Sequence, residues 1–401
     1  MSEWKTYRAD EFCKTVTDGT HDSPKPQPSG RYLITSKHLK SFEIDFSSAN
    51  KITEEDYNKI IQRSKVEQYD ILFSMIGTIG NIHRVTIPNV DFAVKNMGIF
   101  KMGGDTAKSL WMYYWLQSLE AKKYINSRIT GSTQGYLTLK NLRDFPVCVP
   151  PLAEQKRIAD ILSAIDDKIE LNRRINANLE QQAQALYKEW FIDAKKDDWK
   201  EVPLSEVADF VGGYSYKGNE LVESSMTAMA TIKNFERKGG FKVDGFKDIV
   251  ASNKLKAEHH ANLFDILVAH TDLTQNADVI GNAEMLLTFD KYSDIIFSMD
   301  LVKVLPKQTF PYKYLLAALL KNPHFKKHCM GYVNGTTVLH MSKKALPEYV
   351  INLPSAEEIQ SMDNAFKAYY LKMAEILQEN NNLSTLRDTL LPKLMSGEIT
   401  V

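Results

Sequence analysis

The sequence predicts two α/β domains of the α+β kind, each followed by a long helix, in a chain with pseudo-twofold internal duplication. Three observations support this fold class. One stretch of sequence recurs about 204 residues later, two segments of about 40 residues have a helical pattern, and the remainder alternates strand-like runs with polar loops. This period is far longer than the roughly 20 to 50 residues of solenoid repeats, so it indicates a duplicated pair of domains.

The duplication is clearest between TGSTQGYLTLKNLRDFPVCVPP at 130–151 and NGTTVLHMSKKALPEYVINLPS at 334–355. Without a gap, Gly131 aligns with Gly335. Upstream the offset shifts by a few residues and pairs Trp4 with Trp199, Lys5 with Lys200, Tyr69 with Phe264 and Gly80 with Gly281. A protein with two like halves usually binds a ligand with two like halves, and inside a cell that ligand is most often duplex DNA.

We divide the chain into a first domain at 1–150, a first helical segment at 151–198, a second domain at 199–354 and a second helical segment at 355–401. The net charge of the whole chain is zero. The two domains carry 20 basic against 16 acidic residues and 18 against 17, whereas both helical segments are acidic. This distribution permits nucleic-acid binding by the domains without establishing it.

The two helical segments are defined by composition and by apolar spacing. After Pro151, about 40 residues contain neither Pro nor Gly and are rich in strong helix formers. Apolar residues recur at alternating steps of three and four, which is the pattern of a coiled coil. Ser355 and Glu358 form a capping-box signature at the start of the second helix, and Pro392 breaks its pattern near the end.

A helix of about 40 residues is about 60 Å long and cannot bury its apolar seam within one small domain. We therefore expect the two helices to pair as an antiparallel coiled coil. The alternative is that each helix packs flat on its own domain. We also expect Asn176 and Asn380 to form a hydrogen bond across the pair that fixes its register. The predicted core of the helix pair comprises Leu162, Ile165, Ile169, Asn176, Leu179, Leu186, Met373, Ile376, Asn380, Leu383 and Leu390.

Cysteine usage and hydropathy limit the class of protein. Cys13, Cys148 and Cys329 lie far apart and lack C-x-x-C spacing, which argues against a disulfide scaffold and against the common zinc modules. The N-terminus has no apolar core of a signal peptide, and no run approaches the roughly 18 apolar residues of a membrane span. We expect a cytoplasmic protein with no membrane partner.

Motifs for catalysis are weak in this chain. Asn322-Pro323-His324-Phe325 lacks the second proline of an amino-methyltransferase tetrapeptide, and no glycine-rich nucleotide loop follows a strand. His324 and His328 have the i, i+4 spacing of metal ligands, but no third ligand lies beside them in the sequence. We predict no catalytic residue, no metal site and no cofactor in this chain.

One helical motif carries a family resemblance. PPLAEQKRIADILSAIDDKIELNRRINANLEQQAQALYKEWF at 150–191 resembles the first central helix of the specificity subunits of type I restriction–modification systems. DILFS and GTIGN in the first domain, GSTQ at 131–134 and LLPKLMSGEI at 390–399 also match that family, and the resemblance covers nearly the whole chain. The second helix departs from it by reading SAEEIQSMDNAFKAY where a closer copy of PLAEQKRI is expected.

The resemblance implies that 1–150 and 199–354 are target recognition domains, each reading half of a split double-stranded DNA sequence. It implies that the helices form a spacer that docks two methyltransferase subunits, which carry S-adenosylmethionine. Restriction/translocase subunits, with ATP and magnesium, can join them. The chain itself is then a non-catalytic subunit. Because the loops of the two halves differ, we expect an asymmetric, interrupted target.

Candidate DNA contacts are polar loop residues, because base readout needs paired donors and acceptors and phosphate contacts use Lys, Arg, Ser, Thr and loop amides. In the first half they are Thr20, His21, Lys37, Ser74, Thr78, Asn81, Ser132, Thr133 and Gln134. In the second half they are Tyr216, Lys217, Lys233, Asn234, His270, Thr271, Gln275, Asn334, Thr336 and Thr337. Any one of them can instead be a turn or cap residue.

Two other functions remain open at this point. The chain can be a coiled-coil adaptor that presents two peptide-binding domains, or an enzyme with an unrecognised site. Salt-dependent DNA affinity distinguishes the adaptor from the DNA reader. For the docking of partner subunits we expect exposed helix residues, namely Arg157, Lys168, Arg173, Arg174, Glu180 and Tyr187.

Overall fold

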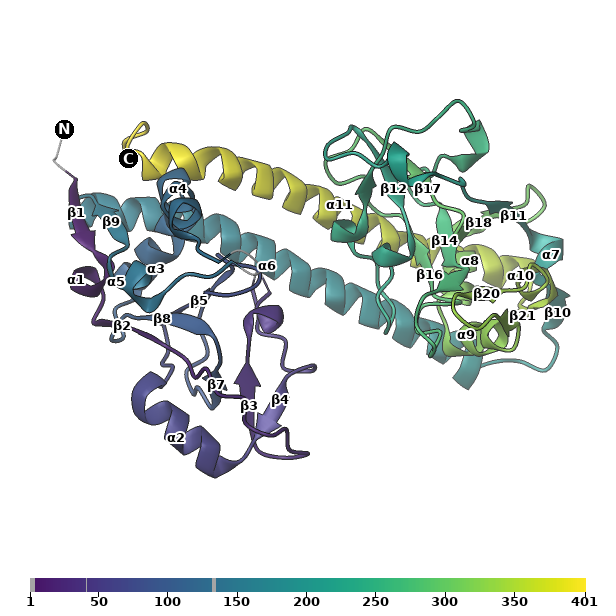
Figure 1. Ribbon diagram of the computed structural model, residues 1–401. Helices are drawn as coiled ribbons and strands as arrows, with labels where there is room; N and C mark the ends of the chain where they lie inside the picture. The colour runs from purple at the N-terminus through teal and green to yellow at the C-terminus, as the bar shows by residue number, and fades with distance from the viewer. Residues whose placement is uncertain (1–3, 41, 132–134) are drawn as a thin grey trace. The chain divides into compact units, whose positions relative to one another are not determined.

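The computed structural model describes residues 4–40, 42–131 and 135–401 (Figure 1). The chain divides into two compact units. Unit 1 comprises Met1–Glu170 and Leu383–Val401, and unit 2 comprises Leu171–Asn382. Each unit therefore contains one globular domain together with a stretch of both long helices.

Unit 1 is built on two sheets and a two-stranded ribbon. The four-stranded antiparallel sheet has the order β2(Thr15–Asp18), β8(Met97–Lys101), β5(Ile71–Ser74), β6(Ile82–Arg84). The three-stranded sheet has the order β4(Asn50–Ile52), β3(Arg31–Ile34), β7(Phe92–Val94), with β3 and β7 parallel. The ribbon pairs β1(Lys5–Arg8) with β9(Pro146–Val149). The helices are α1(Ala9–Phe12), η1(Ser36–His38), α2(Glu54–Ser64), α3(Thr106–Trp115), α4(Leu119–Arg128) and α5(Leu139–Arg143).

Unit 2 repeats this arrangement. Its four-stranded sheet has the order β11(Ala208–Gly212), β18(Leu301–Pro306), β14(Ile266–Ala269), β16(Ala283–Met285). The three-stranded sheet is β13(Lys247–Asp248), β12(Thr227–Ala230), β17(Asp294–Phe297), again with one parallel pair, and the ribbon is β10(Lys200–Pro203) with β21(Val350–Leu353). A further sheet is formed by β15(Thr271–Asp272), β20(Leu339–Met341) and β19(Val333–Asn334). The helices are α7(Leu204–Val207), η3(Gly218–Glu220), η4(Ile232–Asn234), η5(Val243–Gly245), η6(Ala257–His259), α8(Lys313–Leu320), α9(Pro323–Met330) and α10(Ala345–Glu348).

The aligned positions of the two halves adopt the same backbone conformation. Tyr69 and Phe264 have φ values of 71° and 69°, and Gly131 and Gly335 have 107° and 111°. A φ in this range is strained for a residue with a side chain, so its recurrence at an aromatic position marks a shared turn. The predicted internal duplication is therefore present in the strand order and in the backbone.

The same turn carries a matched, partly buried ion pair. Asp70 Oδ2 accepts the amide of Glu67 at 2.8 Å and lies 3.2 Å from Lys101 Nζ. In unit 2, Asp265 Oδ2 accepts the amide of Asn262 at 2.9 Å and lies 3.6 Å from Lys303 Nζ. Each carboxylate closes the turn before a central strand, and the lysine of the neighbouring strand compensates its charge.

Two long helices occupy the segments predicted to be helical, α6(Leu152–Lys188), which continues into a π-helical turn, and α11(Ala356–Met395). In unit 2 they run antiparallel, because Asn172 Nδ2 donates to Asn380 Oδ1 at 2.9 Å and Asn176 Nδ2 donates to the Met373 carbonyl at 3.2 Å. In unit 1, Arg387 Nη1 of α11 lies 2.9 Å from Asp166 Oδ1 of α6. In the described ranges, no helix combines the length and hydropathy needed to cross a membrane.

The expected hydrogen bond between Asn176 and Asn380 is wrong. Asn172 faces Asn380 and also donates to Glu379 Oε2 at 2.8 Å, while Asn176 Oδ1 is buried without a hydrogen-bond partner among the described residues. Asn176 and Asn380 are equivalent copies, and equivalent copies face each other in an antiparallel pair only at its twofold axis. Each step forward along α6 is a step back along α11, so Asn176, four residues after Asn172, meets the level of Met373.

The predicted seam residues have the following burial. Leu162, Ile165, Ile169, Met373 and Ile376 are buried, and Leu179, Leu186, Leu383 and Leu390 are half-buried. Leu179 and Leu186 pack against the core of unit 2, and Leu390 packs against the core of unit 1. Each helix therefore uses its apolar face both for the helix pair and for the domain core of that unit.

Candidate nucleic-acid interface

The carboxyl ends of β3 and β7 meet at one edge of unit 1, because these two strands are parallel. Lys95 donates its amide to the Ile34 carbonyl at 2.9 Å, and Thr20 donates its amide to the Val94 carbonyl at 3.0 Å. The Asn96 amide in turn donates to the Thr20 carbonyl at 3.0 Å. The segments after β2, β3 and β7 are thus held side by side. We call this region, residues 19–23, 35–38 and 95–97, the carboxyl edge of unit 1.

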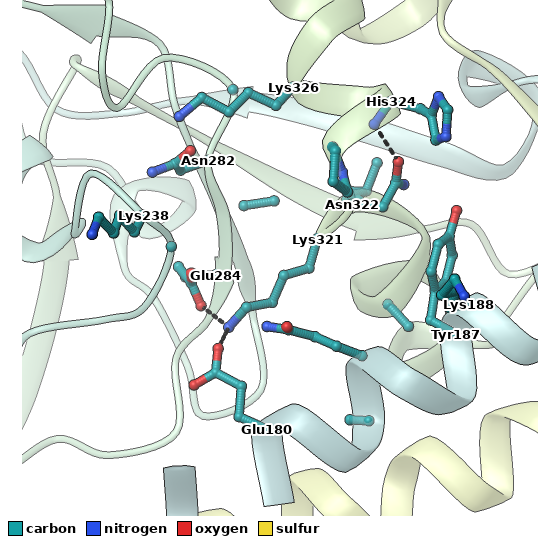
Figure 2. A pocket seen from close by; sticks show the side chains of 18 of the residues that line it. Glu180, Tyr187, Lys188, Lys238, Asn282, Glu284, Lys321, Asn322, His324 and Lys326 are labelled. Carbon is teal, nitrogen blue, oxygen red and sulfur yellow. Dashed lines mark hydrogen bonds and ion pairs between the residues drawn. The ribbon is translucent and has the colours of Figure 1, made fainter. Parts of the chain in front are cut away.

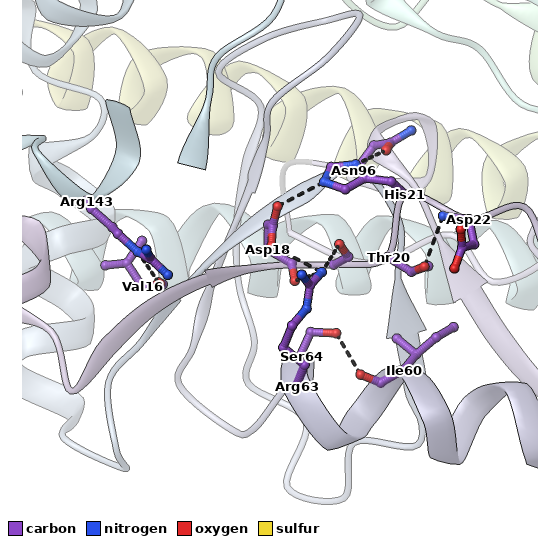
Figure 3. Close-up of polar contacts among 11 residues, drawn as sticks. Val16, Asp18, Thr20, His21, Asp22, Ile60, Arg63, Ser64, Asn96 and Arg143 are labelled. Atoms are coloured by element: carbon purple, nitrogen blue, oxygen red, sulfur yellow. Dashed lines mark hydrogen bonds and ion pairs between the residues drawn. The ribbon is translucent and has the colours of Figure 1, made fainter. Parts of the chain in front are cut away.

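A polar network covers the carboxyl edge of unit 1 (Figure 3). His21 Nδ1 lies 2.9 Å from Asn96 Oδ1, and His21 Nε2 lies 3.0 Å from Asp18 Oδ2. Arg63 of α2 lies 3.3 Å from Asp18 Oδ1 and donates to the Gly19 carbonyl at 3.1 Å. Asp18 is buried, while the side chains of His21 and Arg63 are exposed. The network therefore orients a histidine, an arginine and an amide toward solvent.

The turn η1 projects Lys37 from the same edge. The Thr35 amide donates to His38 Nδ1 at 2.9 Å, and the Asp45 amide donates to the His38 carbonyl at 2.8 Å. Burial, followed by the charge of Lys37, lowers the pKa of His38, so its ring stays neutral and can accept this hydrogen bond. Lys37 itself is exposed.

The carboxyl edge of unit 2 has the same construction, in residues 213–217, 231–234 and 298–300. The amides of Tyr214 and Ser298 donate to the carbonyls of Phe297 and Ala230 at 2.8 and 2.9 Å. The Met299 amide donates to the Tyr214 carbonyl at 2.9 Å. Lys217 and Lys233 are exposed here, and Tyr216 is half-buried under Lys247 Nζ, 5.7 Å from the ring centre.

Asn234 does not face a ligand, in contrast to our expectation. Its side chain is fully buried, accepts the Thr231 amide at 2.8 Å and donates to the Lys242 carbonyl at 2.7 Å. Thr20 is similarly buried, and its Oγ1 accepts the Asp22 amide at 3.1 Å. Both residues shape the edge from within, because their polar atoms are already used by the backbone.

A second group of predicted residues lies on the β5–β6 turn of unit 1. Thr78 is exposed and Asn81 is half-buried. Ser74 is fully buried, donates its hydroxyl to the Thr78 carbonyl and accepts the Asn81 amide at 2.8 Å, so it closes the turn and cannot reach DNA. Ser132, Thr133 and Gln134 lie outside the described residues.

The corresponding loops of unit 2 are joined to each other and to its carboxyl edge. Gln275 Nε2 donates to the Thr336 carbonyl at 2.8 Å, and Asn334, Thr336 and Thr337 are exposed. The Thr271 hydroxyl is buried and donates to Asp300 at 3.0 Å, so Thr271 supports these loops from inside. His270 is half-buried; its burial, with the nearby charges of His340 and Lys343, lowers its pKa.

Other candidate chemistry is absent from the described ranges. No cluster of three His, Cys, Asp or Glu side chains there could hold a metal ion. His328 Nε2 lies 2.8 Å from the Ala345 carbonyl, which explains its position without a metal. Burial raises the pKa of both Cys13 and Cys329 to about 12, so neither thiol is an activated nucleophile.

The chain is similar to proteins of one family. Residues 1–181 match the family model described as the type I restriction modification DNA specificity domain. Over the full length of both chains, the protein is 24% identical to the type I restriction enzyme HindI specificity subunit of Haemophilus influenzae. Residues 1–181 therefore contain a type I restriction modification DNA specificity domain, and the full chain is similar to specificity subunits of type I restriction enzymes. It is also 23% identical to the MjaIX specificity subunit of Methanocaldococcus jannaschii, over 92% of this chain and 86% of that one.

A solved structure has the same fold as this chain. The S subunit of the type I system from M. genitalium matches with a TM-score of 0.54 at 16% identity, covering 98% of this chain and 96% of that chain. The predicted fold class is confirmed. The predicted similarity to type I specificity subunits is confirmed, and the comparisons do not favour a peptide-binding adaptor.

Part of the carboxyl edge of unit 1 was not predicted from the sequence. Asp18, Arg63 and Asn96 were not predicted, although they hold or flank His21. Asp18 and Arg63 are separated by more than 40 residues, and no local pattern relates α2 to β2. The parallel pairing of β3 and β7, which creates the edge, is likewise a long-range contact without a sequence motif.

Proposed function

We propose that the carboxyl edge and adjoining loops of each unit bind one half of a bipartite, asymmetric DNA target. The observation that carries this proposal is that the two edges share one backbone frame and present different side chains. Unit 1 presents His21, Asn96 and Arg63, whereas unit 2 presents Tyr216 and Lys217. Different donors and acceptors on equivalent frames favour different base sequences at the two half-sites.

The exposed groups suit a nucleic acid. Arginine, lysine, histidine and amide side chains offer hydrogen bonds to base edges and to phosphates. After the buried Ser74, Asn234, Thr20 and Thr271 are set aside, the accessible candidates in unit 1 are His21, Lys37, Thr78 and Asn81. In unit 2 they are Tyr216, Lys217, Lys233, His270, Gln275, Asn334, Thr336 and Thr337. We assign the recognition domains to 1–150 and 199–354, with the helical segments at 151–198 and 355–401.

Methylation-aware sequencing tests the bipartite target. DNA is taken from cells that express this chain with its methyltransferase subunit, and the methylated motif is read directly. We expect two different half-sites separated by unspecified bases. A palindromic motif contradicts the asymmetric reading, and a pair of variants sharpens the test: His21→Ala should alter one half-site and Tyr216→Ala the other.

The helices are proposed to dock two methyltransferase subunits, which supply S-adenosylmethionine, and the assembled complex can recruit restriction/translocase subunits that use ATP and magnesium. The accessible candidates are Arg157, Arg173 and Arg174, which are exposed, and Lys168, which is half-buried. Glu180 lies 2.6 Å from Lys321 Nζ, and Tyr187 stacks on Phe191, with ring centres 5.2 Å apart. These two residues therefore serve the packing of unit 2 and are removed from the docking face.

Charge reversal tests the docking face. The double variant Arg173→Glu/Arg174→Glu should reduce co-purification of the methyltransferase subunit, because it inverts the charge of one helix surface. Lys37→Gln, on the carboxyl edge, serves as the matched control and should leave assembly unchanged. Equal co-purification of both variants would show that Arg173 and Arg174 are only solvated.

A further inference from the structure

We propose that Lys37 and Lys233 are a matched pair of contacts to the DNA phosphate backbone, one in each half-site. The side chains that follow Gly19 and Gly213 then read the bases. This inference rests on the proposed function, and it sorts the residues of each carboxyl edge into phosphate contacts and base contacts. It follows from comparing the two edges of the same chain.

The turns that carry the two lysines share three hydrogen bonds. The amides of His38 and Asn234 both donate to the carbonyl of the preceding threonine, at 2.9 Å in each turn. The amide of each threonine donates to the side chain of the fourth turn residue. Thr35 donates to His38 Nδ1 at 2.9 Å, and Thr231 donates to Asn234 Oδ1 at 2.8 Å. The carbonyls of His38 and Asn234 then accept amides from Asp45 and Lys242 at 2.8 and 2.7 Å.

Only the lysine and the first threonine are unchanged within these turns, which read Thr-Ser-Lys-His at 35–38 and Thr-Ile-Lys-Asn at 231–234. The threonine is explained by its place at the start of the turn. The lysine has no such role, because its side chain is exposed and makes no hydrogen bond or ion pair with any residue in the described ranges. Each edge thus holds a cation at the same place, with no partner among the residues that the structure describes.

The chain segment beside each lysine is anchored alike and then diverges. A Cβ atom on Gly19 would lie 2.2 Å from the Val94 carbonyl oxygen, and one on Gly213 would lie 2.1 Å from the Ser298 carbonyl oxygen, so both positions exclude a side chain. The residues that follow are Thr-His-Asp at 20–22 and Tyr-Ser-Tyr at 214–216. The frame is retained and the presented groups change.

The chemistry of duplex DNA relates these two patterns to two kinds of contact. The phosphate backbone is the same in any two half-sites, whereas the bases of an asymmetric target differ. A side chain that is the same on both edges is therefore suited to the phosphates. Side chains that differ on the same frame are suited to the bases.

Salt dependence of DNA affinity tests the assignment. The complex of the full chain with its methyltransferase subunits is titrated with a duplex carrying the methylated motif and with a scrambled duplex, at several salt concentrations. Lys37→Gln and Lys233→Gln should each lower affinity for both duplexes about eight-fold at 0.1 M salt and reduce the slope of log K against log salt by about 1. The double variant should reduce the slope by about 2, since each lysine contacts its own half-site.

The control is a second matched pair of exposed lysines away from the carboxyl edges. Lys5 and Lys200 occupy the first positions of the β1–β9 and β10–β21 ribbons. Lys5→Gln and Lys200→Gln should leave the salt slope unchanged. His21→Ala and Tyr216→Ala should change the preferred bases of one half-site and keep the slope.

Two results overturn the assignment. An unchanged slope in Lys37→Gln and Lys233→Gln shows that these lysines are only solvated, and a change of preferred base in either variant shows that the lysine reads sequence. A wild-type complex that binds motif and scrambled duplexes equally contradicts the proposed function itself, which separates that failure from a failure of the lysine assignment.

Discussion

The two domains share a frame but differ in charge at one pair of equivalent interior positions. In unit 2, Lys321 Nζ lies 2.5 Å from Glu284 Oε2 on β16 and 2.6 Å from Glu180 Oε1 on α6 (Figure 2). The equivalent positions of unit 1 are His83 on β6 and Gln117, which precedes the cap of α4 as Lys321 precedes the cap of α9. One domain thus ties its sheet to α6 through an ion triad, and the other places neutral groups at these sites.

In unit 1, a different set of residues connects the domain to the two long helices. The Tyr114 hydroxyl on α3 donates to Asp166 Oδ2 at 2.9 Å, and Arg387 of α11 lies 2.9 Å from the other oxygen of the same carboxylate. In unit 2, the position that corresponds to Tyr114 in α3 is Ala318. The comparison teaches that the frame tolerates exchange of its interior polar groups, provided that each buried charge has a partner.

The first prediction concerns the triad and has the largest expected effect. Burial lowers the pKa of Lys321, but the carboxylates of Glu284 and Glu180 outweigh burial and raise it, so the ammonium is charged. Lys321→Met would leave the buried carboxylate of Glu284 without a compensating charge, which typically costs about 3–5 kcal/mol. Lys321 borders a cavity of about 700 Å³ that can admit water, so we expect the lower end, about 3 kcal/mol.

Denaturant unfolding, combined with hydrogen exchange measured separately for each unit, gives this loss in the free energy of unfolding. The matched control is Gln117→Met, the same substitution at the equivalent position of unit 1, which should change the free energy of unfolding by less than about 1 kcal/mol because it leaves no charge unpaired. Equal effects of the two substitutions would contradict the contrast between the charged Lys321 position and the neutral Gln117 position.

The second prediction concerns pH and unit 1. Burial lowers the pKa of His83 from its ordinary 6.5 to about 4, so the folded domain holds a neutral ring. The pKa of His83 is lower in the folded state than in the unfolded state. The contribution of the neutral ring to the free energy of unfolding is therefore fully present above pH 6.5 and is lost as the pH falls toward 4. The loss reaches about 3 kcal/mol, from about 1.4 kcal/mol per pKa unit.

His83→Gln should flatten the pH dependence of unit 1 between these limits, since glutamine keeps a polar amide and does not titrate there. A residual slope is expected from His38, whose pKa is also lowered by burial. Unit 2 carries Glu284 at the position of His83, and its exchange rates should not respond to the His83→Gln substitution. An unaltered slope in unit 1 would show that His83 is already solvated in the folded domain.

Local sequence patterns predicted the repeat, the helix segments and the turns. The capping box at Ser355 is present, with the Ser355 amide donating to Glu358 Oε2 at 3.0 Å and the Glu358 amide donating to Ser355 Oγ at 3.4 Å. Gly80 and Gly281, aligned between the halves, both have positive φ. These features depend on residues that are close in sequence, so composition and spacing were sufficient to find them.

Contacts between distant segments were not predictable in this way. The Lys321 triad joins α6, β16 and the end of α8, and no spacing relates these elements. Buried candidates such as Ser74 and Asn234 were indistinguishable from exposed loop residues, because a polar side chain that closes a turn has the same composition as one that contacts a ligand. The register of the helix pair was misjudged because sequence alignment gives equivalent positions, not facing positions.

The third prediction uses that register. Asn172→Ala should destabilise unit 2 by about 1–3 kcal/mol, because it removes a donor from the buried Asn380 carbonyl oxygen. Asn176→Ala should cost less than about 1 kcal/mol, because Asn176 donates only to a helix carbonyl and its own oxygen has no partner. Thermal unfolding of both variants gives the comparison, and a larger loss in Asn176→Ala would restore the register expected from the repeat.

The last prediction has the smallest expected effect on stability and addresses the helices that both units share. If α6 and α11 set the distance between the recognition domains, four residues added to each helix at the boundary between the units should lengthen the spacer of the DNA target. The boundary follows Glu170 in α6 and Asn382 in α11, so the hydrogen bond from Asn172 to Asn380 and the ion pair from Asp166 to Arg387 both remain within their own units.

Four residues add about 6 Å at 1.5 Å per residue, which corresponds to one or two base pairs. The two half-sites should keep their sequences, because neither carboxyl edge is altered. As a control, the same four residues are placed in the exposed segment 195–198 that connects α6 to β10, where they leave the helices unchanged. The methylated motif decides the outcome: a spacer of unchanged length with full methylation in the helix variant shows that the helices do not measure the distance.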